Sequence, residues 1–462
     1  MGAGRGTWGT RLGFYLAAIG SAFGLGNIWR FPYIVSENGG GAFVLLYVFL
    51  VFILGMPLLV GELILGRTTR SGVMRAIDIV LEDHKNSPNQ SRVSKMKWLG
   101  IGSVVLCLIV LAYYAVISGW VLHYLTQLSM ALIVNVSFEA DQSLKLLLEN
   151  GWLQVLLTSV HLLVVIVIVA KDVEEGIEKA VGYMMPLFVI LLIGLAIKSL
   201  SLESAPNALR FFLYPDFSSL TLESLGQAVG HVFFTLSIGF GMMVTFGSYL
   251  SDRAYIPIAG FRVATMDSFI SIFAGVLIFP LVMVGTAPVS GPEMLFRSVP
   301  KLFQTISNGY LFGVGFFVCL YLAALGASIG LLETIVSNAR ESLGFRRVRA
   351  VWVSGGACFI LALLPALSTS VFQEIHIGGQ GFLEFLDGLL INWGLPVAAL
   401  ITSQVVLYLV SDAQKKQAFE LNSEEHHSSE KIYGHWIFAL RWLVSPVILL
   451  ALVLQVFAIF KR

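Results

Sequence analysis

Long apolar runs separated by short polar inserts repeat along the whole chain of 462 residues. Each run reaches the length of about 20 residues that a helix needs to cross the ~30 Å hydrocarbon core of a bilayer. The pattern predicts an all-α polytopic membrane protein with eleven spans, at 10–36, 41–69, 97–125, 152–170, 176–198, 225–252, 258–286, 308–341, 348–368, 381–411 and 433–460.

Two of these spans contain helix-breaking residues at membrane depth. The first reads GSAFGLGNIWRFP over residues 20–32 and breaks near 22–26, and the sixth reads FFTLSIGFGMMVTFGS over 233–248 and breaks around 237–241. An unpaired backbone group in lipid costs several kcal/mol, so such a break must be buried in protein or line a wet cavity. Two breaks five spans apart predict an inverted repeat with a binding site at the bilayer midplane. The alternative is a pair of packing kinks at small residues.

The expected organisation follows from this repeat. The first repeat covers residues 10–199 and the second covers 200–411, each with five helices. A cytoplasmic segment at 1–9 precedes them, and a cytoplasmic loop at 412–432 leads to an extra helix within 433–462.

Composition and charge narrow the function classes. Hydrophobic residues make up 57% of the chain, charged residues only 12%, and the net charge is +1. Such a balance gives no bulk attraction to nucleic acid, so we expect none as a partner. Basic residues crowd the insert between the second and third spans, which predicts a cytoplasmic N-terminus and a place in the inner (plasma) membrane of the cell. Cys107, Cys319 and Cys358 lie in apolar runs without disulfide or zinc spacing.

A broken helix can bind charged groups of both signs. The half-helix after a break presents free N–H groups that suit a carboxylate, and the half-helix before it presents carbonyls that suit a hard cation. Asn27, Thr235 and Asp267 flank the two breaks. Asp267 has no basic residue near it in sequence, so a metal cation would keep it ionised; the alternative is a protonated, hydrogen-bonded acid.

Four segments now carry a family resemblance: WGTRLGF, GLGNIWRFP, ENGGGAF and FFTLSIGFG. They resemble the neurotransmitter:sodium symporter family, specifically its bacterial amino-acid transporters, and the likeness extends from Trp8 through the last span. It implies the leucine-transporter fold and a non-enzymatic symporter that imports a neutral, hydrophobic amino acid with sodium by alternating access. A transporter-like amino-acid receptor is the alternative from another class, and an enzyme would need a nucleophile–base or metal-ligand set that the breaks lack.

The resemblance also implies a substrate site. The substrate carboxylate should rest on the backbone N–H groups of Leu25 and Gly26 and on the hydroxyl of Tyr114. Gly24 stands where carriers of monoamines have an aspartate, so the substrate should bring its own carboxylate. The substrate amine should meet carbonyls of Ala22, Phe234 and Thr235. The substrate side chain should face Val110, Phe234, Ser237, Phe240, Ala327 and Leu331.

For the ions, the resemblance implies one complete and one doubtful sodium site. The first should use Ala22, Asn27, Thr235 and Asp267. The second should use carbonyls of Gly20, Phe23 and Ala323 and two hydroxyls, but Gly326 and Ala327 stand at the hydroxyl positions. Ser328 lies one step beyond, turned away by about 100°. One or two sodium ions, a proton in place of the second, and a one-residue misalignment all stay open.

Chloride and the gates complete the expectations. Chloride-dependent members bind the anion near a tyrosine, a glutamine and two serines; here Tyr47 and Ser271 remain, His231 replaces the glutamine, and Asp267 supplies a fixed negative charge. Chloride should therefore not be required. Arg30 with Asp387 should close the outer side, with Tyr114 and Phe240 as an aromatic lid, and Arg5 with Glu341 should close the inner side. A small-molecule amino acid and the lipid bilayer are the expected partners, and the chain should be a monomer or a dimer.

Overall fold

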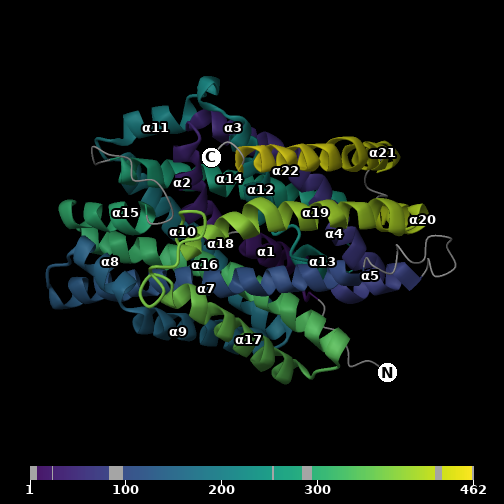
Figure 1. Cartoon of the computed structure of the whole chain (residues 1–462), viewed down its shortest axis with the longest axis horizontal. Coiled ribbons are helices and arrows are strands. Elements are labelled where there is room, and N and C mark those ends of the chain that lie inside the picture. The colour runs from purple at the N-terminus through teal and green to yellow at the C-terminus, as the bar shows by residue number, and fades with distance from the viewer. Residues whose placement is uncertain are drawn as a thin grey trace.

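The computed structural model describes residues 8–22, 24–82, 97–251, 254–283, 294–421 and 429–459. Within these ranges the chain is helical and forms no strand. Long helices lie side by side along the longest axis of the molecule (Figure 1). Nine of the described helices are long and apolar enough to cross a membrane, and a bent pair adds a tenth span. The predicted all-α polytopic fold is confirmed.

The first span is this bent pair. Helix α1 (Arg11–Ala22) is followed by η1 (Gly26–Arg30) and α2 (Phe31–Glu37), with a bend of 41° at the break. The nine other candidate spans are formed by α3 (Gly41–Leu50), η2 (Val51–Gly55) and α4 (Met56–Thr69), by α7 (Lys97–Val134), by α9 (Gly151–Ala170), by η3 (Val173–Glu178) and α10 (Lys179–Leu200), by α14 (Ile256–Val282), by α16 (Gly309–Leu343), by α17 (Arg347–Leu367), by α18 (Phe382–Asp387), η5 (Gly388–Gly394), α19 (Leu395–Gln404) and η6 (Val405–Leu409), and by α21 (Ser429–Ala439), η8 (Leu440–Val444) and α22 (Ser445–Ile459). The described residues thus give ten candidate spans where the sequence predicts eleven, because the predicted sixth span is divided into two helices, α12 (Leu222–Thr235) and α13 (Met242–Ser248), that are each too short to cross a membrane.

The sixth span is interrupted where the sequence predicts it. Helix α12 ends at Thr235 and α13 begins at Met242, and Ser237, Gly239 and Gly241 between them have φ values of 56°, 88° and 73°. The Glu62 carboxylate accepts a 2.8 Å hydrogen bond from the Gly239 N–H and is fully buried. A carboxylate from α4 thus satisfies a backbone group that the break leaves open, which lipid could not do.

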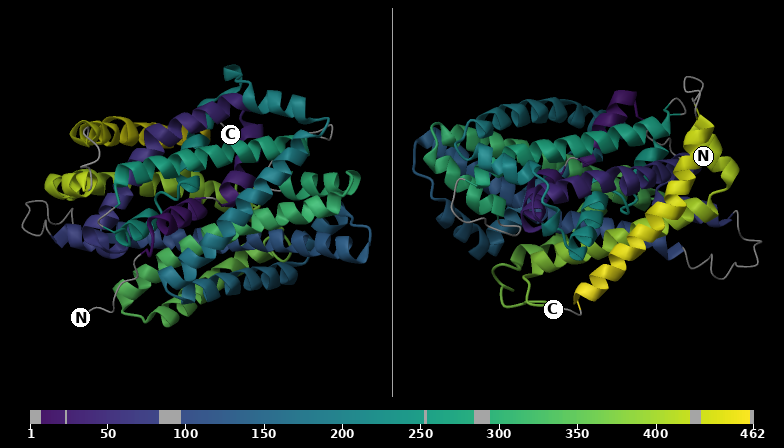
Figure 2. Two further views of the ribbon diagram at one scale, coloured as in Figure 1. Left: turned by 180° about the vertical axis from the view of Figure 1, so that it is seen from behind. Right: turned by 90° about the horizontal axis from the view of Figure 1, so that it is seen from above.

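Shorter helices that the sequence analysis did not anticipate cover the two ends of the bundle. Helices α5 (Val73–Glu82) and α20 (Asp412–Glu420) lie at the end of the bundle where α1 begins (Figures 1 and 2). At the opposite end lie α8 (Ala140–Glu149), α11 (Ala205–Leu213) and α15 (Met294–Thr305). Spans that cross the bundle alternately produce this distribution.

The two broken spans meet inside the bundle. Helix α12 packs against η1, and α13 packs against α1, which also contacts α10, α14 and α16. The residues at both breaks are buried, including Leu25, Asn27, Leu236 and Phe240. Backbone groups at the breaks therefore face protein rather than lipid.

Candidate functional site

A small cavity lies between the two breaks. Its volume is about 20 Å³, which is room for roughly one water molecule. It is lined by Ser21, Ala22, Gly24, Gly26, Tyr114, Phe234, Thr235, Ser237, Phe240, Met242, Ala327 and Leu331. Of the residues expected at a substrate site, Leu25 and Val110 are buried but do not line it, while Ser21 and Met242 line it without having been expected. The structure is thus a closed form of this site.

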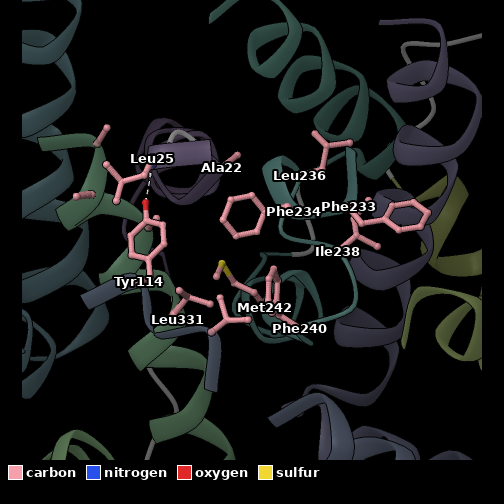
Figure 3. Packing of buried hydrophobic residues seen from close by; sticks show 14 of the residues in the cluster. Ala22, Leu25, Tyr114, Phe233, Phe234, Leu236, Ile238, Phe240, Met242 and Leu331 are labelled. Atoms are coloured by element: carbon pink, nitrogen blue, oxygen red, sulfur yellow. Dashed lines mark hydrogen bonds between the residues drawn. The ribbon is translucent and has the colours of Figure 1, made fainter. Parts of the chain in front are cut away.

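Tyr114 of α7 reaches the break in the first span. Its phenol oxygen accepts a 2.6 Å hydrogen bond from the Leu25 N–H (Figure 3). A Cβ atom placed on Gly24 would lie 2.6 Å from the same oxygen, so a side chain there would displace Tyr114. The Phe234 ring packs edge-on against the Tyr114 ring, with the ring centroids 6.5 Å apart. Phe240, the expected partner of Tyr114 in an aromatic lid, lines the same cavity as these two rings.

A carboxylate holds the two breaks together. Asp267 of α14 accepts hydrogen bonds from the Asn27 amide (2.8 Å), the Tyr47 hydroxyl (2.6 Å) and the Thr235 hydroxyl (3.2 Å). All four side chains are essentially buried, and no lysine or arginine bonds to Asp267 among the described residues. A buried charge without a cationic partner is costly unless a cation joins it.

The donor set around Asp267 fits a hard cation. The side-chain oxygen of Asn27 is buried and has no hydrogen-bond partner within the described residues. Together with the Asp267 carboxylate and the Thr235 hydroxyl it provides oxygen ligands of the kind that alkali and alkaline-earth cations prefer. Of the expected first sodium set, Asn27, Thr235 and Asp267 are joined by hydrogen bonds, whereas the Ala22 carbonyl accepts a 3.0 Å hydrogen bond from the Gly24 N–H.

Asp267 also occupies the neighbourhood expected for an anion. Tyr47 lies 3.1 Å from both the Thr235 and the Ser271 hydroxyls, and Ser271 accepts a 2.8 Å hydrogen bond from Asn27. His231 contributes differently from a glutamine, because its Nδ1 accepts a 3.1 Å hydrogen bond from Arg30. The hydroxyls that would surround an anion instead surround the Asp267 carboxylate.

Arg30 and Asp387 form the expected ion pair. The Arg30 Nε lies 3.1 Å from the Asp387 carboxylate, and Tyr33 and Tyr113 donate to the same carboxylate at 3.0 and 3.3 Å. A second cavity of about 370 Å³ is lined by Asp387 and by Trp29, Tyr113 and His376, among others. Since Arg30 also lies over the Phe234 ring, the ion pair separates this larger cavity from the small one.

The other end of the bundle holds a second set of polar contacts. Arg5 lies outside the described residues, and Glu341 accepts a 2.8 Å hydrogen bond from the Gly72 N–H. Trp8 donates from its ring nitrogen to the Phe246 carbonyl, and Tyr249 donates to Glu333, which pairs with Arg347 at 2.8 Å. This buried network joins α13, α16 and α17 to the segment that precedes α1.

The start of α1 is tied to the start of the fifth span. The Glu178 carboxylate accepts hydrogen bonds from the Gly9 N–H (2.9 Å) and the Thr10 hydroxyl (2.6 Å). The Thr10 oxygen in turn accepts a 2.8 Å bond from the Gly13 N–H, which is the contact of a helix N-cap. Gly176 lies in η3 before Glu178, and Pro186 lies in α10 after it.

The expected second sodium set is only partly described. Phe23 lies outside the described residues. Gly20 of α1 and Ala323 of α16 are buried, and the two helices pack against each other. On α16, Gly326 faces the Gly20 carbonyl, Ala327 lines the small cavity, and Ser328 contacts His161 of α9.

Comparison with known proteins gives a consistent picture. The profile of the family described as "Sodium:neurotransmitter symporter family" matches residues 5–136 and 134–462. The uncharacterized sodium-dependent transporter YhdH of Bacillus subtilis is 33% identical over 445 residues, which cover 96% of each chain. The sodium-dependent neutral amino acid transporter B(0)AT2 of Mus musculus is 30% identical over 60% of this chain and 40% of its own. The crystal structure of MhsT in complex with L-phenylalanine superposes with a TM-score of 0.88 at 32% identity, covering 98% of this chain and all of that one.

Proposed function

The chain belongs to the sodium:neurotransmitter symporter family, and we propose that it imports a neutral, hydrophobic amino acid together with sodium by alternating access. Its relatives are sodium-dependent transporters rather than enzymes, and its helices are those of a multi-pass membrane protein. The observation that carries the proposal is the hydrogen bond between Leu25 and Tyr114 at the break of the first span.

This hydrogen bond supports an amino acid as the substrate. The Leu25 N–H is a hydrogen-bond donor at the break, and the Tyr114 hydroxyl on α7 is able to donate as well. A carboxylate placed between them would accept from both, and charge-assisted hydrogen bonds are roughly twice as strong as neutral ones. In the closed form the two groups satisfy each other, so the site costs little when no substrate is bound. The lack of a side chain at Gly24 leaves this carboxylate position to the substrate.

The cavity lining supports a neutral and hydrophobic side chain. Phe234, Phe240, Met242, Ala327 and Leu331 supply apolar surface, and none of the described lining residues is charged. A charged substrate side chain would be buried there without a partner, at a cost of several kcal/mol. The solved relative MhsT holds L-phenylalanine, and the mouse relative is named for neutral amino acids. We extend that substrate class to this chain.

The Asp267 site supports sodium as the coupling ion and argues against a need for chloride. Asn27, Thr235 and Asp267 offer oxygens from three different spans, so a bound cation would fasten both breaks in one arrangement. At a few ångströms a fixed carboxylate offsets a cation much as a bound anion would. The hydroxyls of Tyr47 and Ser271 already bond to or adjoin that carboxylate.

Alternating access would use the two sets of closing contacts. The pair Arg30–Asp387 closes the path from the larger cavity, and the Glu333–Arg347 network closes the end that holds the N-terminus. We place that end in the cytoplasm and the protein in the plasma membrane, because basic residues gather there. The two repeats, 10–199 and 200–411, would then move relative to each other around the breaks, in a monomer or a dimer.

Binding to purified protein tests the substrate class. Labelled phenylalanine should bind in sodium and fail to bind in potassium, and leucine and tryptophan should compete with it. Phenethylamine, which has the same side chain and amine but no carboxylate, should compete at least about tenfold less well, because the Leu25–Tyr114 contact would go unused. Equal competition by phenethylamine would contradict the proposed carboxylate position, and binding that ignores sodium would contradict the symporter.

A further inference from the structure

The expected second cation site lacks side-chain oxygens on α16. Gly326 and Ala327 stand where hydroxyls should be, and the one nearby hydroxyl, that of Ser328, is engaged elsewhere. Ser328 donates to the Ala324 carbonyl at 2.8 Å and lies 2.9 Å from the Nε2 of His161 on α9. Both Ser328 and His161 are fully buried. The hydroxyl therefore faces α9, on the side of α16 away from α1, and a one-residue change of alignment does not restore the ligand.

The backbones of α1 and α16 lie too close for a ligand to be rebuilt at this position. A Cβ atom added to Gly326 would lie 2.5 Å from the carbonyl oxygen of Gly20, which is backbone and cannot rotate away. A serine or threonine at residue 326 would thus require α1 to move away from α16. In this closed form the Gly20 carbonyl, which should bind the cation, faces the bare backbone of α16.

The remaining side of Gly20 is closed by apolar side chains. A Cβ atom on Gly20 would lie 3.0 Å from Val181 Cγ1 and 3.5 Å from Met185 Sδ, both on α10. Val181 and Met185 are themselves buried. A hard cation needs several oxygen ligands to replace its hydration shell, and aliphatic and thioether groups do not provide them. Three neighbouring helices thus surround this position without a set of oxygen ligands.

The Asp267 site differs in every one of these respects. It brings a carboxylate, a hydroxyl and an amide oxygen without a described partner to one place. We propose that this chain couples transport to a single sodium ion, bound at Asp267, and that direct packing of Gly20 on Gly326 takes the structural place of a second ion between α1 and α16. The proposal rests on the sodium symport proposed above.

Stoichiometry has a measurable thermodynamic consequence. With the membrane potential held at zero, a tenfold sodium gradient can sustain about tenfold accumulation of a neutral substrate through one coupled ion, and about 100-fold through two, since each tenfold factor corresponds to 1.4 kcal/mol. Because an amino acid of this class is a net-neutral zwitterion, one sodium ion also means one positive charge moved for each substrate molecule.

The first test measures this ratio with the wild-type protein in proteoliposomes. At zero potential and fixed pH, labelled phenylalanine should show no net flux when its concentration ratio, inside to outside, equals the sodium concentration ratio, outside to inside. This equality corresponds to the first power of the sodium gradient. Purified protein should also bind one radioactive sodium ion per chain. Balance at the square of the sodium gradient, or two bound ions, would overturn the inference while leaving sodium symport intact. A complete absence of sodium dependence would instead overturn the proposed function.

Restoring a hydroxyl gives the second test. Gly326→Ser should reduce sodium-driven uptake more than tenfold and leave one bound sodium ion, because its Cβ meets the Gly20 carbonyl. Gly315→Ser on the same helix is the matched control, since the nearest atom to a Cβ there, Leu195 Cδ2, is 3.9 Å away, and it should retain uptake. If Gly326→Ser keeps its uptake and binds a second sodium ion, this position is a cation site that lacks only a hydroxyl ligand, and the inference is wrong.

Discussion

The backbone N–H of Leu25 donates a 2.6 Å hydrogen bond to the phenol oxygen of Tyr114, and this bond joins the break in the first span to the unbroken helix α7. Its two groups are those that a substrate carboxylate would need. The cavity beside it holds about 20 Å³, so a substrate can enter only when this contact opens. In the closed form the Leu25 N–H and the Tyr114 hydroxyl therefore satisfy each other's hydrogen-bonding capacity.

Removing the hydroxyl of Tyr114 tests its role directly. Tyr114→Phe should weaken substrate binding by about 10- to 100-fold, because a hydrogen bond to a charged group contributes roughly 1.5–3 kcal/mol. Equilibrium binding of labelled phenylalanine measures the loss. Tyr183→Phe is the control, since Tyr183 on α10 is 73% exposed and should bind substrate as the wild type does. Unchanged binding by Tyr114→Phe would remove this residue from the site.

The charge of Asp267 should decide both sodium affinity and chloride dependence. Asp267→Asn should raise the half-saturating sodium concentration about tenfold or more in chloride-free medium, because the cation loses a full negative charge a few ångströms away. Added chloride should recover part of the activity, since the hydroxyls of Tyr47 and Ser271 are then free for an anion. Asp141→Asn, at an exposed ion pair with Lys301, is the control. Chloride stimulation of the wild type would contradict the assignment.

Breaking the pair Arg30–Asp387 should loosen closure on the side of the larger cavity. Asp387→Asn leaves Arg30, which is only 2% exposed, without its carboxylate, and removal of one partner from a buried pair costs about 3–5 kcal/mol. The closed form should become rare, so that labelled substrate dissociates at least about tenfold faster. Glu384→Gln, one turn earlier on α18, should leave the dissociation rate unchanged. Slower dissociation from Asp387→Asn would show that this pair is not a gate.

The bonds of Glu178 to Gly9 and to the N-cap residue Thr10 should influence opening at the end where α1 begins. Glu178→Gln weakens these bonds, and contacts of this kind at a partly exposed site contribute about 0.5–1 kcal/mol. The population open at that end should rise about two- to fivefold, as measured by thiol labelling of a cysteine introduced at Ala22. Glu175→Gln, on the same segment η3, should behave as the wild type. Equal labelling in both variants would mean that Glu178 does not hold α1.

Much of the fold could be predicted from the hydrophobic pattern alone, because a chain segment that crosses lipid has few ways other than a helix to satisfy its backbone hydrogen bonds. The break of the sixth span, expected at 237–241, occupies residues 236–241 in the structure. The contact between Arg30 and Asp387 was also predictable, because two opposite charges at membrane depth in separate spans need each other. The helices at the bundle ends were missed because they are short and carry polar residues among their apolar ones, so they resemble polar loops in a search for long continuous apolar runs.

Contacts that depend on packing could not be predicted from the sequence. Glu62 lies within the predicted span 41–69, but its bond to Gly239 requires α4 to lie beside the break of the sixth span. Met242 and Ser21 entered the cavity lining because α13 begins directly after a left-handed Gly241 and because α1 ends at the break. The direct packing of Gly20 on Gly326 likewise depends on the distance between two helices, which no residue pattern specifies.

Uptake into proteoliposomes tests the central claim most directly. Labelled phenylalanine should accumulate above its external concentration when a sodium gradient points inward, at fixed pH and with the membrane potential held at zero. Dissipating the sodium gradient with an ionophore should reduce the internal concentration to that outside. Accumulation that persists without a sodium gradient, or binding of phenylalanine that never leads to accumulation, would contradict sodium-coupled transport by this chain.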